Sequence, residues 1–190
     1  MRRARSIIGL PIISLAEGLR VGQVRDLVLD PENHSVAALV VDEASWRREA
    51  EVVPIEMVRS FGRDAITMVD LTGLVKVGSR RELAKLLTSG VKMDGLLAMT
   101  EGGNYLGVIE EVLLGPRGQL LAYEISVGFA EDVNRGKVLL PAEEIRTVGR
   151  DVATFPDELE ELVDEAAPET EAVSNDDALP VLQPARRLTA

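Results

Sequence analysis

The amino-acid sequence repeats itself, and this duplication constrains the fold more firmly than any local propensity does. Residues 54–67 (PIEMVRSFGRDAIT) align without a gap with residues 141–154 (PAEEIRTVGRDVAT), and seven of the fourteen aligned positions are identical. Two further pairs of segments match in the same order, namely residues 21–31 with 106–116 and residues 36–41 with 120–125. The chain is therefore predicted to contain two copies of one structural unit.

Each unit is predicted to consist of short β-strands joined by tight turns. Residues 24–29 and 36–41 are rich in branched aliphatic side chains, which favour strands. Pro31 in the turn between them fixes φ, and the matching turn of the second unit contains Pro116 and Gly118, the latter where a positive φ is needed. Several strands in so short a unit favour a closed or nearly closed barrel, which leaves no exposed strand edge. The predicted fold class is mainly β, with two tandem small barrels.

Two helices are predicted outside the repeated segments. The first begins at Ser79, which has a capping-box partner in Glu82, and its apolar stripe consists of Leu83, Leu86 and Leu87. This linker helix should dock on a barrel. The second helix spans residues 157–167, with an apolar stripe of Leu159, Leu162, Val163 and Ala166. Beyond Pro168 the low hydrophobicity and scattered acids predict disorder.

These patterns divide the chain into four parts. They are a first barrel-like repeat at residues 1–77, a linker helix at residues 78–92, a second repeat at residues 93–155, and an acidic helix and disordered tail at residues 156–190. Each repeat is near the lower size limit for a self-sufficient core, so the two units should support each other.

The net charge of −11 is concentrated near the C-terminus. Residues 156–190 hold ten acids and two bases, whereas residues 1–155 hold 22 acids and 19 bases. Nucleic-acid binding usually needs clustered Lys and Arg, so no direct contact with nucleic acid is expected. The chain has no cysteine, which excludes disulfides and thiolate sites. No apolar run is long enough for a spanning helix, and a cytoplasmic location is expected.

Few side chains could converge into a catalytic or metal site. The one histidine, His34, lies in a turn between strands, where we expect it to face water. The repeated Gly-Arg-Asp at residues 62–64 and 149–151 predicts a solvated turn. Residues 102–104 (GGN) lack the Lys-Ser or Lys-Thr of a phosphate loop and predict a hairpin turn. We therefore expect no catalytic residue, no metal ligand and no cofactor, and the chain is not predicted to be an enzyme.

Residues 42–51 and 126–137 have no counterpart in the other unit. Loops on a rigid scaffold commonly carry recognition, and Trp and Arg are enriched in binding hot spots. The candidates for protein contact are therefore Trp46, Arg47, Arg48 and Phe129. The alternative is that the two aromatic residues close the barrel ends as part of the core.

The order of these motifs resembles the PRC-barrel family. The motifs are a Gly-containing strand, a Pro/Gly hairpin turn, an apolar strand and the pattern V-P-x-E-x-V-x-x-x-G-x-D-A-I. They occur at Gly22, Pro31, residues 36–41 and residues 53–66, and again at Gly107, Pro116, residues 120–125 and residues 140–153. The second copy of the pattern is less complete than the first.

The resemblance implies a bacterial docking module, since the family's common property is binding to a protein partner and it has no universal catalytic residue. The chain is thus interpreted as a non-enzymatic protein-binding scaffold or adaptor. Its partner is either another protein or a second copy of the chain, as a homo-oligomer. The alternative interpretation is a ribosome-maturation or RNA-associated factor that resembles the C-terminal domain of RimM.

Overall fold

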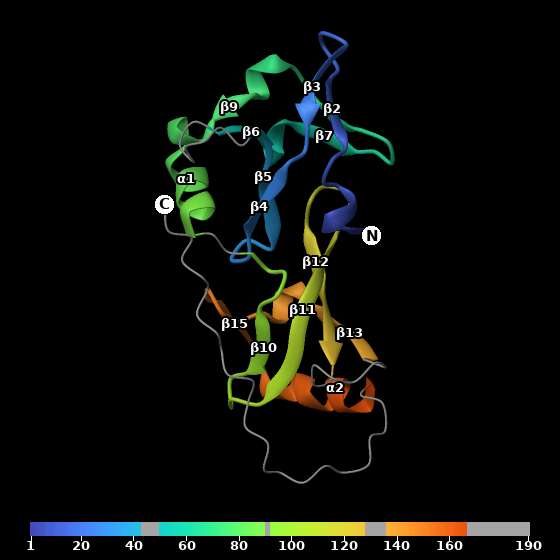
Figure 1. The fold of residues 1–190 in the computed structure, drawn as a ribbon, viewed down its shortest axis with the longest axis vertical. Helices are drawn as coiled ribbons and strands as arrows, with labels where there is room; N and C mark the ends of the chain where they lie inside the picture. Colours follow the sequence, from blue (N-terminus) through green and yellow to red (C-terminus); the bar gives the residue numbers. More distant parts are fainter. Residues whose placement is uncertain (43–49, 90–91, 128–135, 167–190) are drawn as a thin grey trace, which may run out of the picture.

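The computed structural model describes residues 1–42, 50–89, 92–127 and 136–166, which form two β-rich units stacked along the long axis of the molecule (Figure 1). The first unit contains the strands β1 (Arg2–Arg3), β2 (Pro11–Ser14), β3 (Leu19–Gln23), β4 (Asp26–Asp30), β5 (Ser35–Asp42), β6 (Glu51–Pro54), β7 (Val58–Phe61), β8 (Ile66–Met68) and β9 (Val75–Lys76). Its helices are the 3-10 turns η1 (Ala4–Ser6), η2 (Ile55–Met57), η3 (Leu71–Gly73) and η4 (Val77–Ser79), followed by α1 (Arg81–Ser89).

The second unit repeats this order from β10 onwards. Its strands are β10 (Leu97–Thr100), β11 (Tyr105–Leu114), β12 (Leu120–Val127), β13 (Gly136–Pro141), β14 (Thr147–Val148) and β15 (Val152–Phe155). Its helices are η5 (Ala142–Glu144), η6 (Asp157–Leu159) and α2 (Glu160–Ala166).

The strand pairing confirms a mainly β fold, and the sheets formed by the described residues are not closed into barrels. Within the described ranges, the first unit forms two four-stranded sheets, with the orders β3-β2-β8-β7 and β4-β5-β6-β9. The second unit forms one sheet in the order β13-β12-β11-β10-β15-β14, and β1 pairs with β11. The two units differ because β11 is continuous, whereas the equivalent stretch of the first unit is interrupted between Gln23 and Asp26. There Val24 donates to Leu10 O and Arg25 donates to Val40 O, so the chain passes from one sheet to the other.

The strand register shows that aligned residues occupy equivalent places in the two units. Ile12 lies opposite Gly22, and Ala98 lies opposite the aligned Gly107. In each unit a register shift follows this pair directly. Residue-by-residue comparison of the two units is therefore justified by geometry as well as by sequence.

The two units share one hydrophobic core. A single cluster of buried side chains includes Ile12, Leu39 and Met68 from the first unit together with Leu114 and Tyr123 from the second. Burial raises the pKa of the Tyr123 hydroxyl, and its ring packs edge-on against Phe155. The expectation that the units support each other therefore agrees with the packing.

The hairpin turns of the two units meet across a pair of backbone hydrogen bonds. Val36 N donates to Gly118 O at 2.8 Å, and Leu120 N donates to His34 O at 2.8 Å. Because Val36 aligns with Leu120 and His34 with Gly118, exchanging the units exchanges the two bonds. The units are thus joined with approximate two-fold symmetry at this contact. Gly118 has the predicted positive φ of 81°.

Helix α1 docks on the first unit, as predicted. Its Leu83, Leu86 and Leu87 pack against a second apolar cluster on the outer face of β4, β5 and β6. The predicted capping box is absent, because Ser79 Oγ donates to Lys76 O and the helix begins at Arg81.

The C-terminal helix forms close to the predicted residues. Leu159 and Val163 join the main core. Leu162 is 50% exposed, which corrects its predicted place in the buried stripe. On a helix Leu162 lies at the edge of this stripe, about 100° from Val163, which agrees with its exposure.

Candidate protein-binding surface

The loop residues predicted to contact a partner cannot be assigned a place. Trp46, Arg47, Arg48 and Phe129 all lie outside the described residues, so their role stays a prediction.

The other motifs are structural turns. Arg63 pairs with Asp64 at 3.3 Å, with both side chains more than four-fifths exposed, as expected for a solvated turn. Residues 102–104 form the predicted hairpin turn between β10 and β11, with Gly103 at a φ of 92°. In the described ranges, no cluster of three or more His, Asp or Glu side chains could hold a metal ion.

His34 differs from its predicted environment. The residue has a φ of 47°, is only partly exposed, and its carbonyl accepts the bond from Leu120 at the joint between the units. Its Nδ1 atom is buried and has no hydrogen-bond partner among the described residues. The turn was predicted correctly, but the second unit shields it from water.

The clearest difference between the units is the outer face of the sheet that α1 covers in the first unit. In the first unit this face consists of small and branched apolar residues: Val28, Ala37, Ala38, Val40 and Val52. The aligned residues in the second unit are Leu113, Leu121, Ala122, Glu124 and Leu139. We define the open face as Leu121, Glu124, Lys137 and Leu139.

Two leucines of the open face are exposed where their counterparts are covered. Leu121 is 43% exposed and Leu139 is 47% exposed, whereas Val52, the counterpart of Leu139, is fully buried. Exposed leucines are individually common, but these two lie on adjacent, paired strands of one sheet. The open face therefore combines apolar surface with a charged centre.

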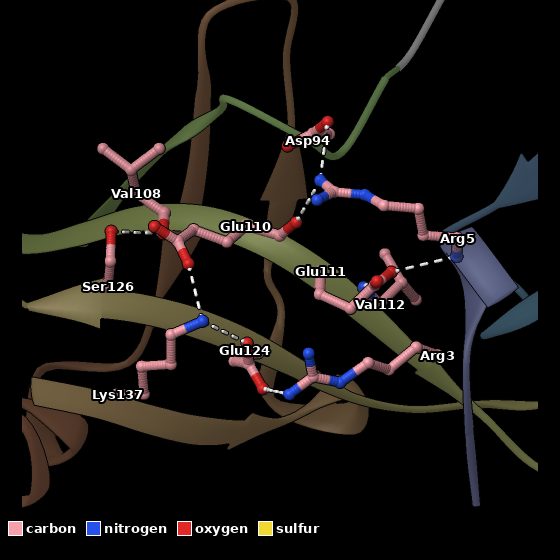
Figure 2. Close-up of polar contacts among 10 residues, drawn as sticks. All are labelled: Arg3, Arg5, Asp94, Val108, Glu110, Glu111, Val112, Glu124, Ser126 and Lys137. Carbon is pink, nitrogen blue, oxygen red and sulfur yellow. Dashed lines mark hydrogen bonds and ion pairs between the residues drawn. The ribbon is translucent and has the colours of Figure 1, made fainter.

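The charged centre is Glu124, whose side chain is only 8% exposed. Arg3 Nη2 donates to one of its carboxylate oxygens at 2.7 Å, and Lys137 Nζ donates to the other at 2.8 Å (Figure 2). Lys137 also pairs with Glu110 at 2.9 Å. The hydrogen bonds to Glu124 and then to Glu110 raise the pKa of Lys137 above its ordinary value. The stabilisation that protonated Lys137 provides through these ion pairs is therefore complete below pH 10.5 and is lost as the pH rises through the raised pKa.

The N-terminal segment contacts the strands of this face through two arginines. Figure 2 shows Arg3 and Arg5 reaching from the N-terminal ribbon towards β11 and β12. Arg5 N donates to Glu111 Oε1 at 3.3 Å, and its guanidinium contacts Asp94 and the Glu110 carbonyl, each at 3.1 Å. Strand β1 pairs with the end of β11, with Arg3 opposite Leu113. Leu113 is buried and is the counterpart of Val28, which belongs to the cluster that α1 packs against in the first unit.

The arrangement is suited to binding. Glu124 and Glu111 are both buried, and both already accept hydrogen bonds within the chain. Two cations compensate the Glu124 carboxylate, which holds it as a structural ion pair. The exposed leucines beside it supply the apolar area that a protein partner could bury.

We expect Glu124→Gln to lower the free energy of unfolding by about 1–2 kcal/mol, because a buried carboxylate loses charge-assisted hydrogen bonds while its two cations remain exposed. The matched control is Glu144→Gln, whose pair with Arg146 spans 3.6 Å at the surface and should change stability by less than about 0.5 kcal/mol. Chemical denaturation at neutral pH measures both values. Equal effects in the two variants would show that burial of Glu124 is unimportant.

Sequence reasoning missed the open face because it looked for inserted loops. The available signal was a substitution within an aligned strand, where Val40 of the first unit corresponds to Glu124 of the second. A charged residue at a position that is apolar in the other unit indicates that this face of the sheet packs against different residues in the two units.

The described residues contain no helix long and apolar enough to cross a membrane. The chain has no significant match among curated proteins. A sequence model of the PRC-barrel domain matches twice, at residues 1–75 and at residues 90–161, so each match contains one of the two units. The two matches cover most of the chain, which therefore belongs to the PRC-barrel domain family.

Proposed function

We propose that the chain is a non-enzymatic scaffold or adaptor that binds a protein partner through the open face of its second unit. The observation that supports this proposal is the exposure of Leu121 and Leu139 at positions equivalent to those that α1 covers in the first unit. Fully burying a leucine side chain is worth about 1.5–3 kcal/mol. A partner that covers this face as α1 covers its counterpart would gain that stabilisation.

The partner best suited to this surface presents apolar side chains that pack around a charged centre. Arg3, Lys137 and Glu124 compensate one another, so the face does not require a strongly charged partner. The first unit supplies the example, since α1 covers its own sheet with three leucines. An amphipathic helix would satisfy the same geometry.

The test is quantitative affinity capture with the intact chain from a lysate, followed by mass spectrometry and a binding measurement with the identified partner. Leu121→Asp should weaken binding at least about tenfold, because a carboxylate replaces apolar contact surface. Leu162→Asp is the control, since Leu162 is exposed to a similar extent but lies on α2. Unchanged binding in Leu121→Asp, or equal losses in both variants, would contradict the proposal. Ribosomal proteins as the main captured set would favour the ribosome-associated alternative.

A further inference from the structure

The two units differ at a second place, which is the outer edge of β6 in the first unit and of β13 in the second. In the first unit β9 pairs with this edge of β6, with Glu51 opposite Lys76 and Val52 opposite Val75. Val77 N extends the pairing by donating to Ala50 O. In the second unit β13 takes the place of β6, and within the described ranges it pairs with β12 alone. Its other edge therefore presents backbone groups that an added strand could bind.

We propose that the outer edge of β13 binds residues 181–183 of the chain's own C-terminal tail, as the edge of β6 binds residues 75–77. The tail follows α2, which contacts β13 and ends at Ala166. Val181 is fifteen residues further along the sequence, a distance of up to about 50 Å in an extended chain. The tail of the same molecule can therefore reach this edge.

The tail has the residue spacing of the segment that fills this edge in the first unit. That segment has a valine followed at the fifth and sixth positions by two arginines, Val75, Arg80 and Arg81. The tail has the same spacing at Val181, Arg186 and Arg187. This spacing sets the register in which the tail would pair with β13.

In that register, both members of a facing residue pair differ in character between the two units. Glu51 faces Lys76 in the first unit, which places opposite charges across the strand pair. The counterpart of Glu51 is Val138, and in the proposed register Leu182 takes the position of Lys76. A charged pair is thus replaced by an apolar pair, and either is a favourable cross-strand combination. Val181 would likewise face Leu139.

The same register brings together a complementary pair of charges. In the first unit Arg80 pairs with Glu56 at 3.3 Å. The counterpart of Glu56 is Glu143, which is exposed and forms no ion pair with the described residues. In the proposed register Arg186 takes the position of Arg80. The second unit therefore retains the acidic partner for an arginine that only the tail supplies.

Disulfide trapping tests the register directly, because the chain contains no cysteine of its own. The trapping variant is Val138→Cys with Leu182→Cys in the full-length protein. Opposed residues of antiparallel strands have Cα atoms about 4.5–5.5 Å apart, within reach of a disulfide. The positive control is Glu51→Cys with Lys76→Cys, and the negative control is Leu121→Cys with Leu182→Cys. We expect an intramolecular disulfide that forms at least about tenfold faster than in the negative control.

A charge exchange tests the second contact. Arg186→Glu should slow trapping of the 138–182 pair, and Glu143→Arg in the same chain should restore it. Amide exchange supplies a measurement without cysteines: truncation after residue 178 should increase exchange at residues 136–141 at least about tenfold.

Trapping no faster than in the negative control, or unchanged exchange after truncation, would overturn the proposal. Disulfide-linked dimers in place of the intramolecular product would assign the edge to the tail of a second copy and would also overturn it. The proposed partner site shares Lys137 and Leu139 with β13, so the two proposals are separated by Leu121→Asp, which lies on β12 and should weaken partner binding without changing trapping of the 138–182 pair.

Discussion

Residues 1–77 and residues 93–155, prepared as separate polypeptides, are expected to show no cooperative thermal transition at the temperature at which the intact chain unfolds. The main core contains buried side chains from both units, so separation exposes apolar surface on each half. It also removes the hydrogen bonds between Val36 and Gly118 and between Leu120 and His34. Units of this length have little stability to lose.

Circular dichroism during heating, with calorimetry of the intact chain, measures this result. The intact chain should unfold in one transition whose calorimetric and van't Hoff enthalpies agree. An equimolar mixture of the halves serves as the control, since it should recover part of the ordered signal if the shared core is the cause. Two halves that each unfold cooperatively at the temperature of the intact chain would contradict the shared core.

Gly107→Ala is expected to lower the free energy of unfolding by about 3–5 kcal/mol. The residue has a φ of 142°, a conformation that side chains rarely adopt. A Cβ atom would also lie 2.3 Å from Ser126 O, in the backbone of the neighbouring strand. Neither problem can be relieved by moving a single side chain.

The matched control is Gly22→Ala, the equivalent position of the first unit. A Cβ at Gly22 would meet only the Cγ1 methyl of Val41, and the backbone there needs no positive φ. This variant should therefore lose less, about 1–2 kcal/mol. Denaturant titration of both variants gives the comparison. Equal losses would show that backbone conformation and the clash with Ser126 O add nothing at Gly107.

Local turn chemistry made much of the fold predictable. The Pro/Gly turn around Gly118, the hairpin at residues 102–104 and the docking of α1 all follow from short segments of sequence. These features depend on dihedral preferences and on side-chain spacing along one element. The turns and the apolar stripe of α1 could therefore be predicted from the short segments that contain them.

Whether the strands close into a barrel could not be predicted from short segments of sequence. The interruption between Gln23 and Asp26 separates two sheets in the first unit, whereas the aligned residues of the second unit belong to one strand, β11. Aligned segments with similar propensities thus pair differently, because pairing depends on neighbours that are distant in sequence.

The candidate surface shows the same limit. Leu121 and Leu139 look like ordinary strand residues, and only the position of α1 over the other unit shows that their face lacks an equivalent cover. Glu124 could be noticed as a charge in an apolar strand, but its partner Arg3 is 121 residues away. No pattern within one segment identifies such a pair.

The sequence by itself determined the duplication, the strands with their turns, the two helices and membership of the PRC-barrel domain family. The tertiary structure decided which faces are covered, that both units share one core, and that Glu124 is compensated by Arg3 and Lys137. The physical reason is the sequence distance over which each kind of interaction acts. Dihedral preferences and periodicity act over a few residues, whereas burial and ion pairing depend on which distant segments the fold brings together.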